Sequence, residues 1–254
     1  MPDNKNDLIE YLLRLGDNAL INGQRLCEWC GRAPALEEEM ALMNVGLDLV
    51  GQARNWYEYA AELLADGRDA DQLAFRRDER AFRNTLLVEQ PNGDYAVTTA
   101  KLFLFDAWHL HTLQALTASS DARIAGIAAK GLKEVTYHLR RSGEWVERLG
   151  DGTEQSRQRM LAGIDEVWRF TNDLLSSDEI QQRLAAAGIA ADATAVAAAW
   201  QASVEQVFER ASLPVPPPAS YFYLDGKRGL HTEHLGILLA EMQFLQRAYP
   251  DATW

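Results

Sequence analysis

Carboxylate and histidine side chains recur at helical spacing within residues 98–140. Asp106 lies three residues before His109, and Glu134 lies four residues before His138. Side chains at these spacings share one face of an α-helix. Faces of this kind supply the ligands of di-iron carboxylate centres in four-helix bundles. The spacing therefore suggests a metal-site hypothesis, which depends on what the other helices of the bundle contribute.

A di-iron bundle needs four carboxylates and two histidines, with a Glu-x-x-His motif on each of two helices. The helix expected at 35–64 offers Asp48, and the helix expected at 154–175 offers Asp165-x-x-Trp168. Trp168 stands where the second histidine should be, and its indole nitrogen carries a proton and cannot ligate a metal. Trp168 is better suited to filling the space between helices. The pattern therefore predicts the remnant of a metal site and no bound metal.

The expected remnant consists of six side chains and the tryptophan, namely Asp48, Asp106, His109, Glu134, His138, Asp165 and Trp168. We interpret it as a buried polar network, because carboxylates in a protein core must be paired or hydrogen-bonded. Arg54, Arg140 and Arg169 lie near enough in sequence to serve as partners. Counted without regard to position, four carboxylates and two histidines remain. A degenerate di-iron or single-metal oxygenase site is therefore the alternative.

Two further groups of metal-binding residue types are weaker candidates. His231 and His234 share a face with Glu241 on the last expected helix, but histidines at a helix start more often cap the helix or contact a partner. Cys27 and Cys30 form a lone CxxC pair with no second pair to complete a zinc site. We expect two reduced thiols packed near the end of a helix.

The composition excludes several classes of function. The formal net charge of −12 argues against a nucleic-acid-binding protein and against a protein of anionic membrane surfaces. No apolar run reaches the roughly 20 residues that span a membrane. The first residues are polar and lack the apolar core of a secretion signal. We therefore expect a cytoplasmic protein with no nucleic-acid or membrane partner.

Apolar residues follow the period of an α-helix almost throughout the chain, which predicts an all-α fold. We expect residues 68–94 to form a charged surface excursion. Residues 214–229, with Tyr221, Phe222 and Tyr223, should form a long extended connection that follows a proline-rich break. The expected helices cover residues 6–29, 35–64, 95–118, 122–149, 154–175, 179–187, 192–211 and 232–248.

We predict one domain over residues 1–254. The core of the helical bundle should occupy about residues 6–176, and additional helices with the proline-rich arm should follow over 177–254. No linker composition separates the two parts, and no internal repeat stands out.

Several long blocks of the sequence resemble one protein family, and together they cover nearly the whole chain. They resemble PaaC, the family of C subunits of bacterial phenylacetyl-CoA epoxidase, which is also called phenylacetate-CoA oxygenase. The blocks are RLGDNALINGQRLCEWCGRAPALEEEMALMNVGLDLVGQAR, LAFRRDERAFRNTLLVEQPNGD, DAWH, KEVTYHLRRSGEWVERLGDGT and GLHTEHLGILLAEMQFLQR.

The resemblance implies a ferritin-like up-down helical fold and a structural role in a hetero-oligomeric complex. In that family a catalytic subunit, PaaA, holds the di-iron centre and binds phenylacetyl-CoA, whose ring becomes a 1,2-epoxide. Electrons come from NADPH through a reductase subunit with flavin and iron–sulfur groups. The resemblance implies no catalytic and no cofactor-binding residue in this chain.

Three hypotheses therefore remain. The leading one is a non-catalytic subunit that stabilises a metal-bearing partner of aerobic phenylacetate degradation through a large apolar interface. Its contact elements would be the arm at 214–229 and the exposed faces of the second and third long helices. The second hypothesis is the degenerate metal site described above, and the third is a free-standing helical protein that binds a small apolar ligand.

Overall fold

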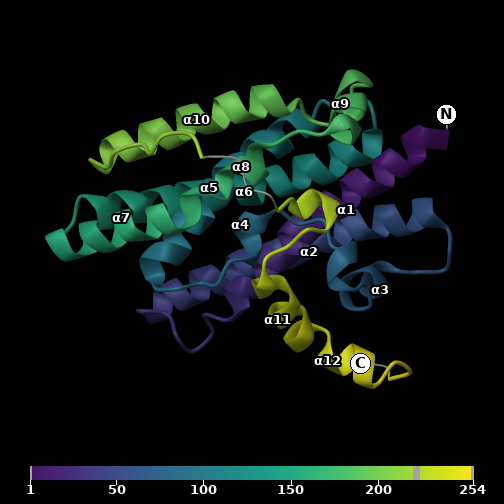
Figure 1. The fold of residues 1–254 in the computed structure, drawn as a ribbon, viewed down its shortest axis with the longest axis horizontal. Coiled ribbons are helices and arrows are strands. Elements are labelled where there is room, and N and C mark those ends of the chain that lie inside the picture. Colours follow the sequence, from purple (N-terminus) through teal and green to yellow (C-terminus); the bar gives the residue numbers. More distant parts are fainter. Residues whose placement is uncertain (1, 220–223, 253–254) are drawn as a thin grey trace. The chain divides into compact units, whose positions relative to one another are not determined.

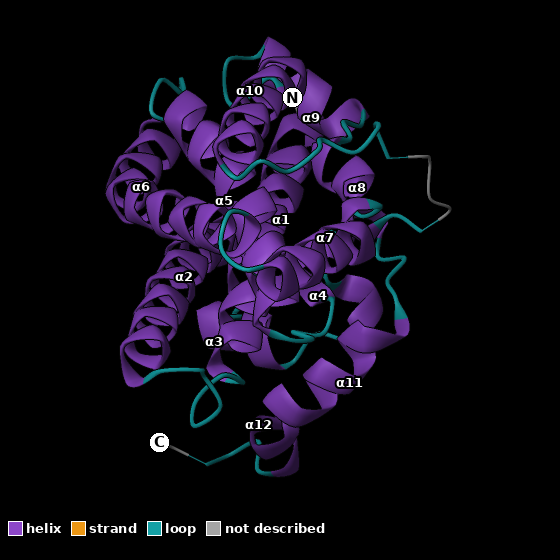
Figure 2. Ribbon diagram, turned by 90° about the vertical axis from the view of Figure 1, so that its left-hand side faces the viewer, coloured by secondary structure: helices purple, strands orange, loops and turns teal. Residues whose placement is uncertain are grey.

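A computed structural model describes residues 2–219 and 224–252, and the regular structure within these ranges is helical (Figures 1 and 2). Twelve α-helices and two short 3₁₀ helices were found there. The pairing of extended backbone is limited, in the same ranges, to one isolated antiparallel bridge between Asp225 and Leu230. The prediction of an all-α fold is confirmed.

The chain divides into two compact units. Unit 1 combines Met1–Pro91 with Tyr223–Trp254, and unit 2 is the continuous stretch Asn92–Phe222 between them. These limits differ from the expected division into a core at 6–176 and a tail at 177–254, because the last helices belong with the first ones. That the whole chain forms one domain stays a prediction.

Unit 1 is organised around two long antiparallel neighbours, α1 (Pro2–Cys27) and α2 (Leu36–Leu64). Glycines let their backbones approach: a Cβ atom on Gly23 would lie 3.2 Å from the carbonyl oxygen of Gly46. The shorter elements of the unit are α3 (Ala70–Phe75), η1 (Glu79–Ala81), α4 (Leu86–Glu89), η2 (Gly226–Arg228), α11 (Glu233–Met242) and α12 (Phe244–Ala248).

Unit 2 is organised around α5 (Tyr95–Leu116), which is apolar on all sides and therefore central. α5 packs against α6 (Ala122–Gly150), α7 (Glu154–Trp168) and α10 (Ala193–Arg210). The indole Nε1 of Trp200 on α10 donates to the carbonyl oxygen of Leu104, 2.9 Å away. The remaining helices of the unit are α8 (Thr171–Leu175) and α9 (Glu179–Ala186).

Capping residues explain where five helices of unit 2 begin, namely α5, α6, α7, α9 and α10. The carboxylates of Asp94, Asp121, Asp178 and Asp192 each accept from backbone N–H groups in the first turn of the helix that follows. Thr153 begins α7 with a reciprocal capping box. These caps satisfy backbone donors that have no partner inside the helix, so the start positions can be read from the sequence.

Two expected helices are interrupted. The helix predicted at 154–175 ends at Trp168 and resumes as α8, and the hydroxyl of Thr171 donates to the carbonyl oxygen of Trp168 in the intervening turn. The helix predicted at 232–248 breaks at Gln243. The buried side-chain amide of Gln243 donates to the carbonyl oxygens of Ala74 and Arg77, which anchors the break.

The prediction of a surface excursion at 68–94 is wrong for much of its length, since Leu73, Ala74 and Arg77 are already buried in its first half. Phe82, Asn84, Thr85 and the whole of α4 are buried in unit 1. The predicted aromatic arm is only partly described: Tyr221, Phe222 and Tyr223 lie outside the described residues.

The contact between α5 and α7 yields a prediction. A Cβ atom on Gly163 would lie 2.9 Å from the backbone nitrogen of Val97, so Gly163→Ala must push the two helices apart. We expect the free energy of unfolding to fall by about 1–3 kcal/mol in urea denaturation.

Gly126→Ala is the matched control, because Gly126 lies inside α6 with nothing within 4 Å of its added Cβ. That change should raise the free energy of unfolding by about 0.5–1 kcal/mol. Equal effects at the two positions would contradict the close-packing argument.

Candidate functional site

Three of the predicted site residues come together in the core of unit 2. Asp106 and His109 belong to α5, His138 belongs to α6, and each is at most 3% exposed. His138 lies close enough to the other two side chains to influence their ionisation. Sequence spacing therefore identified a real polar cluster between two packed helices.

The cluster is only partly satisfied by hydrogen bonds. The hydroxyl of Ser142 lies 2.8 Å from Oδ2 of Asp106 and 3.0 Å from the carbonyl oxygen of His138. Oδ1 of Asp106 and Nδ1 of His109 are buried and have no hydrogen-bond partner in the described part of the chain. Burying polar atoms in this way is costly, so the cluster is held by the packing around it.

Burial sets the protonation of the cluster. It raises the pKa of Asp106 to about 6, against the opposing effects of His138, the Ser142 hydroxyl and Arg141. Burial lowers the pKa of His109 to about 3, and the neighbouring His138 adds to this shift. His109 is therefore a neutral imidazole at physiological pH, while Asp106 titrates in the mildly acidic range.

The other predicted positions do not complete a metal site. Asp48 on α2 and Glu134 on α6 are half-buried and have interactions of their own. Asp165 on α7 is exposed. Trp168 is buried, and its indole Nε1 donates to the carbonyl oxygen of Pro217 over 2.7 Å. The α7 position that should supply a carboxylate and a histidine therefore supplies neither ligand to the core.

The described residues contain no group of three or more His, Cys, Asp or Glu side chains placed to hold a metal ion. The donors present thus do not fit a two-metal centre, which needs four carboxylates and two histidines around the ions. The arrangement can hold or release a proton at Asp106, but all three of its members are buried away from any substrate.

The arginines expected to pair with the cluster are elsewhere. Arg54, Arg140 and Arg169 are all exposed. Arg141 acts on Asp106 instead, and Ser142 supplies the hydrogen bond. The prediction missed both because it weighed arginines by proximity in sequence and did not consider a serine one turn after His138.

Unit 1 contains a second polar network, which sequence reasoning missed. The fully buried carboxylate of Asp17 on α1 accepts from the Tyr57 hydroxyl at 2.5 Å and from the backbone nitrogen of Arg83 at 2.6 Å. Both terminal nitrogens of Arg77 donate to it as well. Removing one partner of a buried ion pair of this kind strongly destabilises the protein, because the other charge stays buried without compensation.

A second buried carboxylate, that of Glu89, connects α4 to the C-terminal segment. Oε1 accepts from the backbone nitrogen and the hydroxyl of Thr232, both at 2.7 Å. Oε2 accepts from Nδ2 of Asn84 at 2.8 Å. The carbonyl oxygen of Glu89 accepts two hydrogen bonds from the guanidinium of Arg25 on α1. The apolar run Leu86–Val88 just before Glu89 was the available signal that this carboxylate is buried.

His231 completes the Glu89 network and is held as an imidazolium. Its Nδ1 lies 2.8 Å from Oε2 of Glu89, and its Nε2 lies 3.0 Å from the carbonyl oxygen of Phe82. Both partners are acceptors, so both ring nitrogens carry protons. Burial opposes the charge, but the hydrogen bonds and the charge of Glu89 raise the pKa of His231. The metal hypothesis for His231 and His234 therefore gains no support, because the nitrogens of His231 are occupied.

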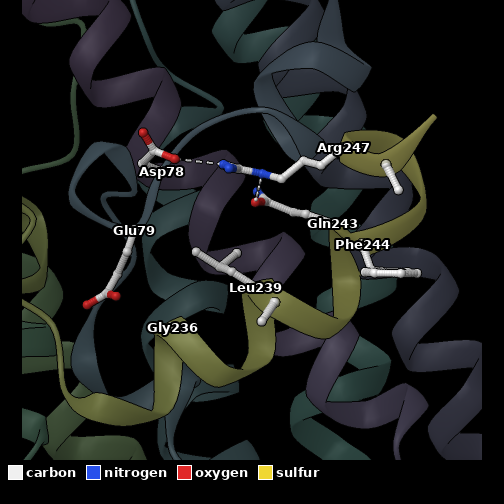
Figure 3. A pocket seen from close by; sticks show the side chains of 9 residues that line it. Asp78, Glu79, Gly236, Leu239, Gln243, Phe244 and Arg247 are labelled. Atoms are coloured by element: carbon white, nitrogen blue, oxygen red, sulfur yellow. Dashed lines mark hydrogen bonds and ion pairs between the residues drawn. The ribbon is translucent and has the colours of Figure 1, made fainter. Parts of the chain in front are cut away.

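A surface pocket opens beside this segment, between η1 and the last two helices (Figure 3). Its one cationic lining group, Arg247, is already engaged by Asp78 at 2.8 Å and by Oε1 of Gln243 at 3.0 Å. The carboxylate of Glu79 lies against Gly236, where an added Cβ would be 2.7 Å from Oε2. The one cationic group among the described lining residues is thus already paired.

Comparison with known proteins gives the class of this one. A family model, PaaA_PaaC, described as phenylacetic acid catabolic protein, matches residues 1–254. The chain therefore belongs to this family of phenylacetic acid catabolic proteins. It is 53% identical over 249 residues to the C subunit of the 1,2-phenylacetyl-CoA epoxidase of Escherichia coli (strain K12). The match covers 98% of this chain and 100% of that protein, and it confirms the resemblance seen in the sequence.

No helix in the described ranges is long and apolar enough to cross a membrane.

The unit 2 cluster predicts a pH-dependent stability. Because the pKa of Asp106 is raised to about 6, the folded state binds more protons than the unfolded state between about pH 4 and 6. This carboxyl therefore lowers stability as pH rises through that window, by roughly 3 kcal/mol at full effect. Asp106→Asn cannot ionise, so its unfolding free energy relative to the parent should increase from pH 4 to pH 7 in urea denaturation.

A companion variant tests the same carboxyl in the opposite sense. Ser142→Ala removes the hydroxyl that stabilises the charged form of Asp106, so the pKa of Asp106 should rise further. The range over which stability falls with rising pH should then extend to higher pH. A difference between Asp106→Asn and the parent that stays constant with pH would show that Asp106 does not titrate in this range.

The imidazolium of His231 predicts the reverse dependence in unit 1. Because the pKa of His231 is raised in the folded state, its contribution is fully present below about pH 6.5 and is lost as pH rises through the raised value. His231→Gln should therefore lower the free energy of unfolding by roughly 1.5–3 kcal/mol at pH 6 and by less at pH 9, measured by urea denaturation. His234→Gln is the control, because the carboxylate beside that ring, Glu233, is exposed. A loss that grows with pH would refute the charged form.

Proposed function

We propose that this chain is a structural, non-catalytic subunit of a multicomponent phenylacetyl-CoA 1,2-epoxidase, a di-iron monooxygenase of aerobic phenylacetate degradation. Its role is to bind and stabilise the catalytic PaaA subunit in a hetero-oligomer. The proposal is supported by the family, by the name of the Escherichia coli relative and by one surface feature of α2.

That feature carries the structural role. Five apolar side chains of α2 follow one another at intervals of four and three residues, and four of them are exposed by 41–69%. Met43 between them is half-buried. Intervals of four and three place side chains along one line of a helix, as in the contact seam of a coiled coil. We call this line the α2 seam, and its members are Leu36, Met40, Met43, Leu47 and Val50.

Most of the α2 seam is separate from the face that holds α2 in its own unit; only Val50 borders α1, where a Cβ on Gly23 would lie 3.3 Å from its Cγ2. Leu42, Val45, Leu49 and Trp56 lie on the opposite side of the helix, and all are at most 2% exposed. α2 therefore has two apolar faces, and only one of them is covered by the described part of the chain. Contiguous exposed apolar surface on a soluble protein marks an interaction site. A line about 21 Å long suits an apolar helix of a partner protein.

The other expected contact elements contribute less. α5, the third long helix, has only Gln114 and Ala115 exposed, so it offers no broad face. Among the described residues of the arm at 214–229, the exposed large apolar side chain is Val215, at 37%. The prediction that α5 supplies a contact face is therefore wrong, because α5 forms the centre of unit 2.

The chemistry of the core agrees with a non-catalytic role. A donor set that lacks an inward carboxylate and a histidine on α7 cannot hold two irons in the usual geometry. We therefore assign the di-iron centre to the partner, PaaA, and NADPH, flavin and iron–sulfur groups to a reductase subunit. We expect the complex to be cytoplasmic, with no nucleic-acid or membrane partner.

The α2 seam gives the decisive experiment. Leu47→Glu puts a charge at one of the two most exposed positions of the seam. Because Leu47 is 69% exposed, the isolated chain should keep its stability within about 0.5 kcal/mol. Binding to PaaA should weaken at least about tenfold, since burying a leucine contributes about 1.5–3 kcal/mol. Titration calorimetry and size-exclusion chromatography of the mixture measure the effect.

Ile237→Glu is the matched control, because Ile237 is 62% exposed on α11 and lies off the seam. Unchanged binding of Leu47→Glu would reject the seam as the interface. Near-stoichiometric iron in the isolated chain, or full epoxidase activity of PaaA without this chain, would reject the structural role itself.

A further inference from the structure

The two cysteines of the chain lie together at the end of α1. The helix ends at Cys27, and the backbone continues in tight turns. Three successive hydrogen bonds connect residues three apart, and the last runs from the nitrogen of Cys30 to the carbonyl oxygen of Cys27 at 3.1 Å. The chain from Arg25 to Cys30 therefore has the hydrogen-bond pattern of a 3₁₀ helix.

This pattern places the two thiols within reach of each other. In a 3₁₀ helix, side chains at positions i and i+3 eclipse, and a rise of 2.0 Å per residue puts their Cα atoms about 6 Å apart. Disulfides form across Cα separations of about 4.4–6.8 Å. Cys30 is also near enough to raise the pKa of the Cys27 thiol. A bond between the two sulfurs thus requires little backbone movement.

The turn is held in place from its other side. Nη1 of Arg25 donates to Oε1 of Glu28 at 2.7 Å, and the same guanidinium donates to the carbonyl oxygen of Glu89. Trp29 is only 9% exposed and fixes the middle of the turn. An anchored turn loses little conformational entropy when a bond closes across it, which favours an intramolecular disulfide.

The cysteines themselves are accessible, and both are reduced in this structure. Cys27 also touches α2, since a Cβ on Gly46 would lie 3.7 Å from its Sγ. Packing, with the nearby Cys30 and Glu28, raises the pKa of the Cys27 thiol. Catalytic CxxC pairs depend instead on a lowered pKa. This pair therefore lacks the thiolate character of a catalytic CxxC pair.

We propose that Cys27 and Cys30 form a reversible dithiol–disulfide site, whose oxidants are low-molecular-weight disulfides such as glutathione disulfide. One cysteine thiolate attacks a sulfur of glutathione disulfide and releases one glutathione thiolate. The other cysteine thiolate attacks the protein sulfur of the mixed disulfide, which forms the Cys27–Cys30 bond and releases the second glutathione. Two electrons pass to glutathione disulfide, and the two thiol protons end on the two glutathione molecules.

The test uses the full reduced chain incubated with glutathione disulfide under native conditions. Thiol titration, intact mass and a non-reducing gel are recorded before and after the reagent is removed. Because the chain has no other cysteine, every thiol that the titration counts belongs to Cys27 or Cys30. We expect both thiols to be lost, the mass to fall by two hydrogen atoms and the chain to migrate as a monomer. Dithiothreitol should restore both thiols.

Cys27→Ser and Cys30→Ser are the matched controls, and circular dichroism checks that each keeps its fold. Each should stop at the mixed disulfide and retain one glutathione adduct. Stable glutathione adducts on both cysteines of the parent chain would overturn the proposal. Disulfide-linked dimers as the main product would overturn it too. The reaction needs no partner protein, so its outcome is independent of the proposed function.

Discussion

The carboxylate of Glu89 is the interaction on which unit 1 depends. A fully buried carboxylate is tolerated only when donors surround it, and here the donors come from Asn84, His231 and Thr232. The carbonyl oxygen of the same residue accepts a hydrogen bond from the guanidinium of Arg25 on α1. One residue on a four-residue helix thereby joins the first helix, the middle loop and the C-terminal segment. Asp17 repeats this arrangement nearby with Arg77 and Tyr57.

Unit 2 is stabilised differently. Its centre is an almost entirely apolar helix, α5, and its polar cluster at Asp106 and His109 contains buried atoms with no hydrogen-bond partner in the described residues. In unit 1 the buried charges of Asp17 and Glu89 are neutralised by specific partners, whereas in unit 2 burial keeps His109 neutral and raises the pKa of Asp106. Facing helices of metal-binding bundles place their ligands in the same kind of core position. The indole of Trp168 and the exposed Asp165 explain why these donors do not complete such a site.

Local signals made much of the fold predictable. The expected helices at 95–118 and 122–149 match α5 and α6 closely, because Asp94 and Asp121 mark their starts in the sequence. The networks were not predictable in this way. Arg77 pairs with a residue 60 positions away, and His231 pairs with one 142 positions away. A charged side chain is taken for a surface residue until its distant partner is known, so the prediction for 68–94 failed. The interruption at Gln243 depends on such distant contacts as well.

The order of the two units along the chain has a consequence for synthesis. In the sequence, unit 2 is one uninterrupted stretch between the two segments of unit 1, and the second of these segments includes His231. A chain that emerges from the ribosome N-terminus first can complete unit 2 while Glu89 still lacks its imidazolium and the donors of Thr232. Unit 1 is therefore completed only when the C-terminal helices arrive. A chain that stops short of residue 231 lacks His231 and Thr232, so the carboxylate of Glu89 in its N-terminal half is left without those donors.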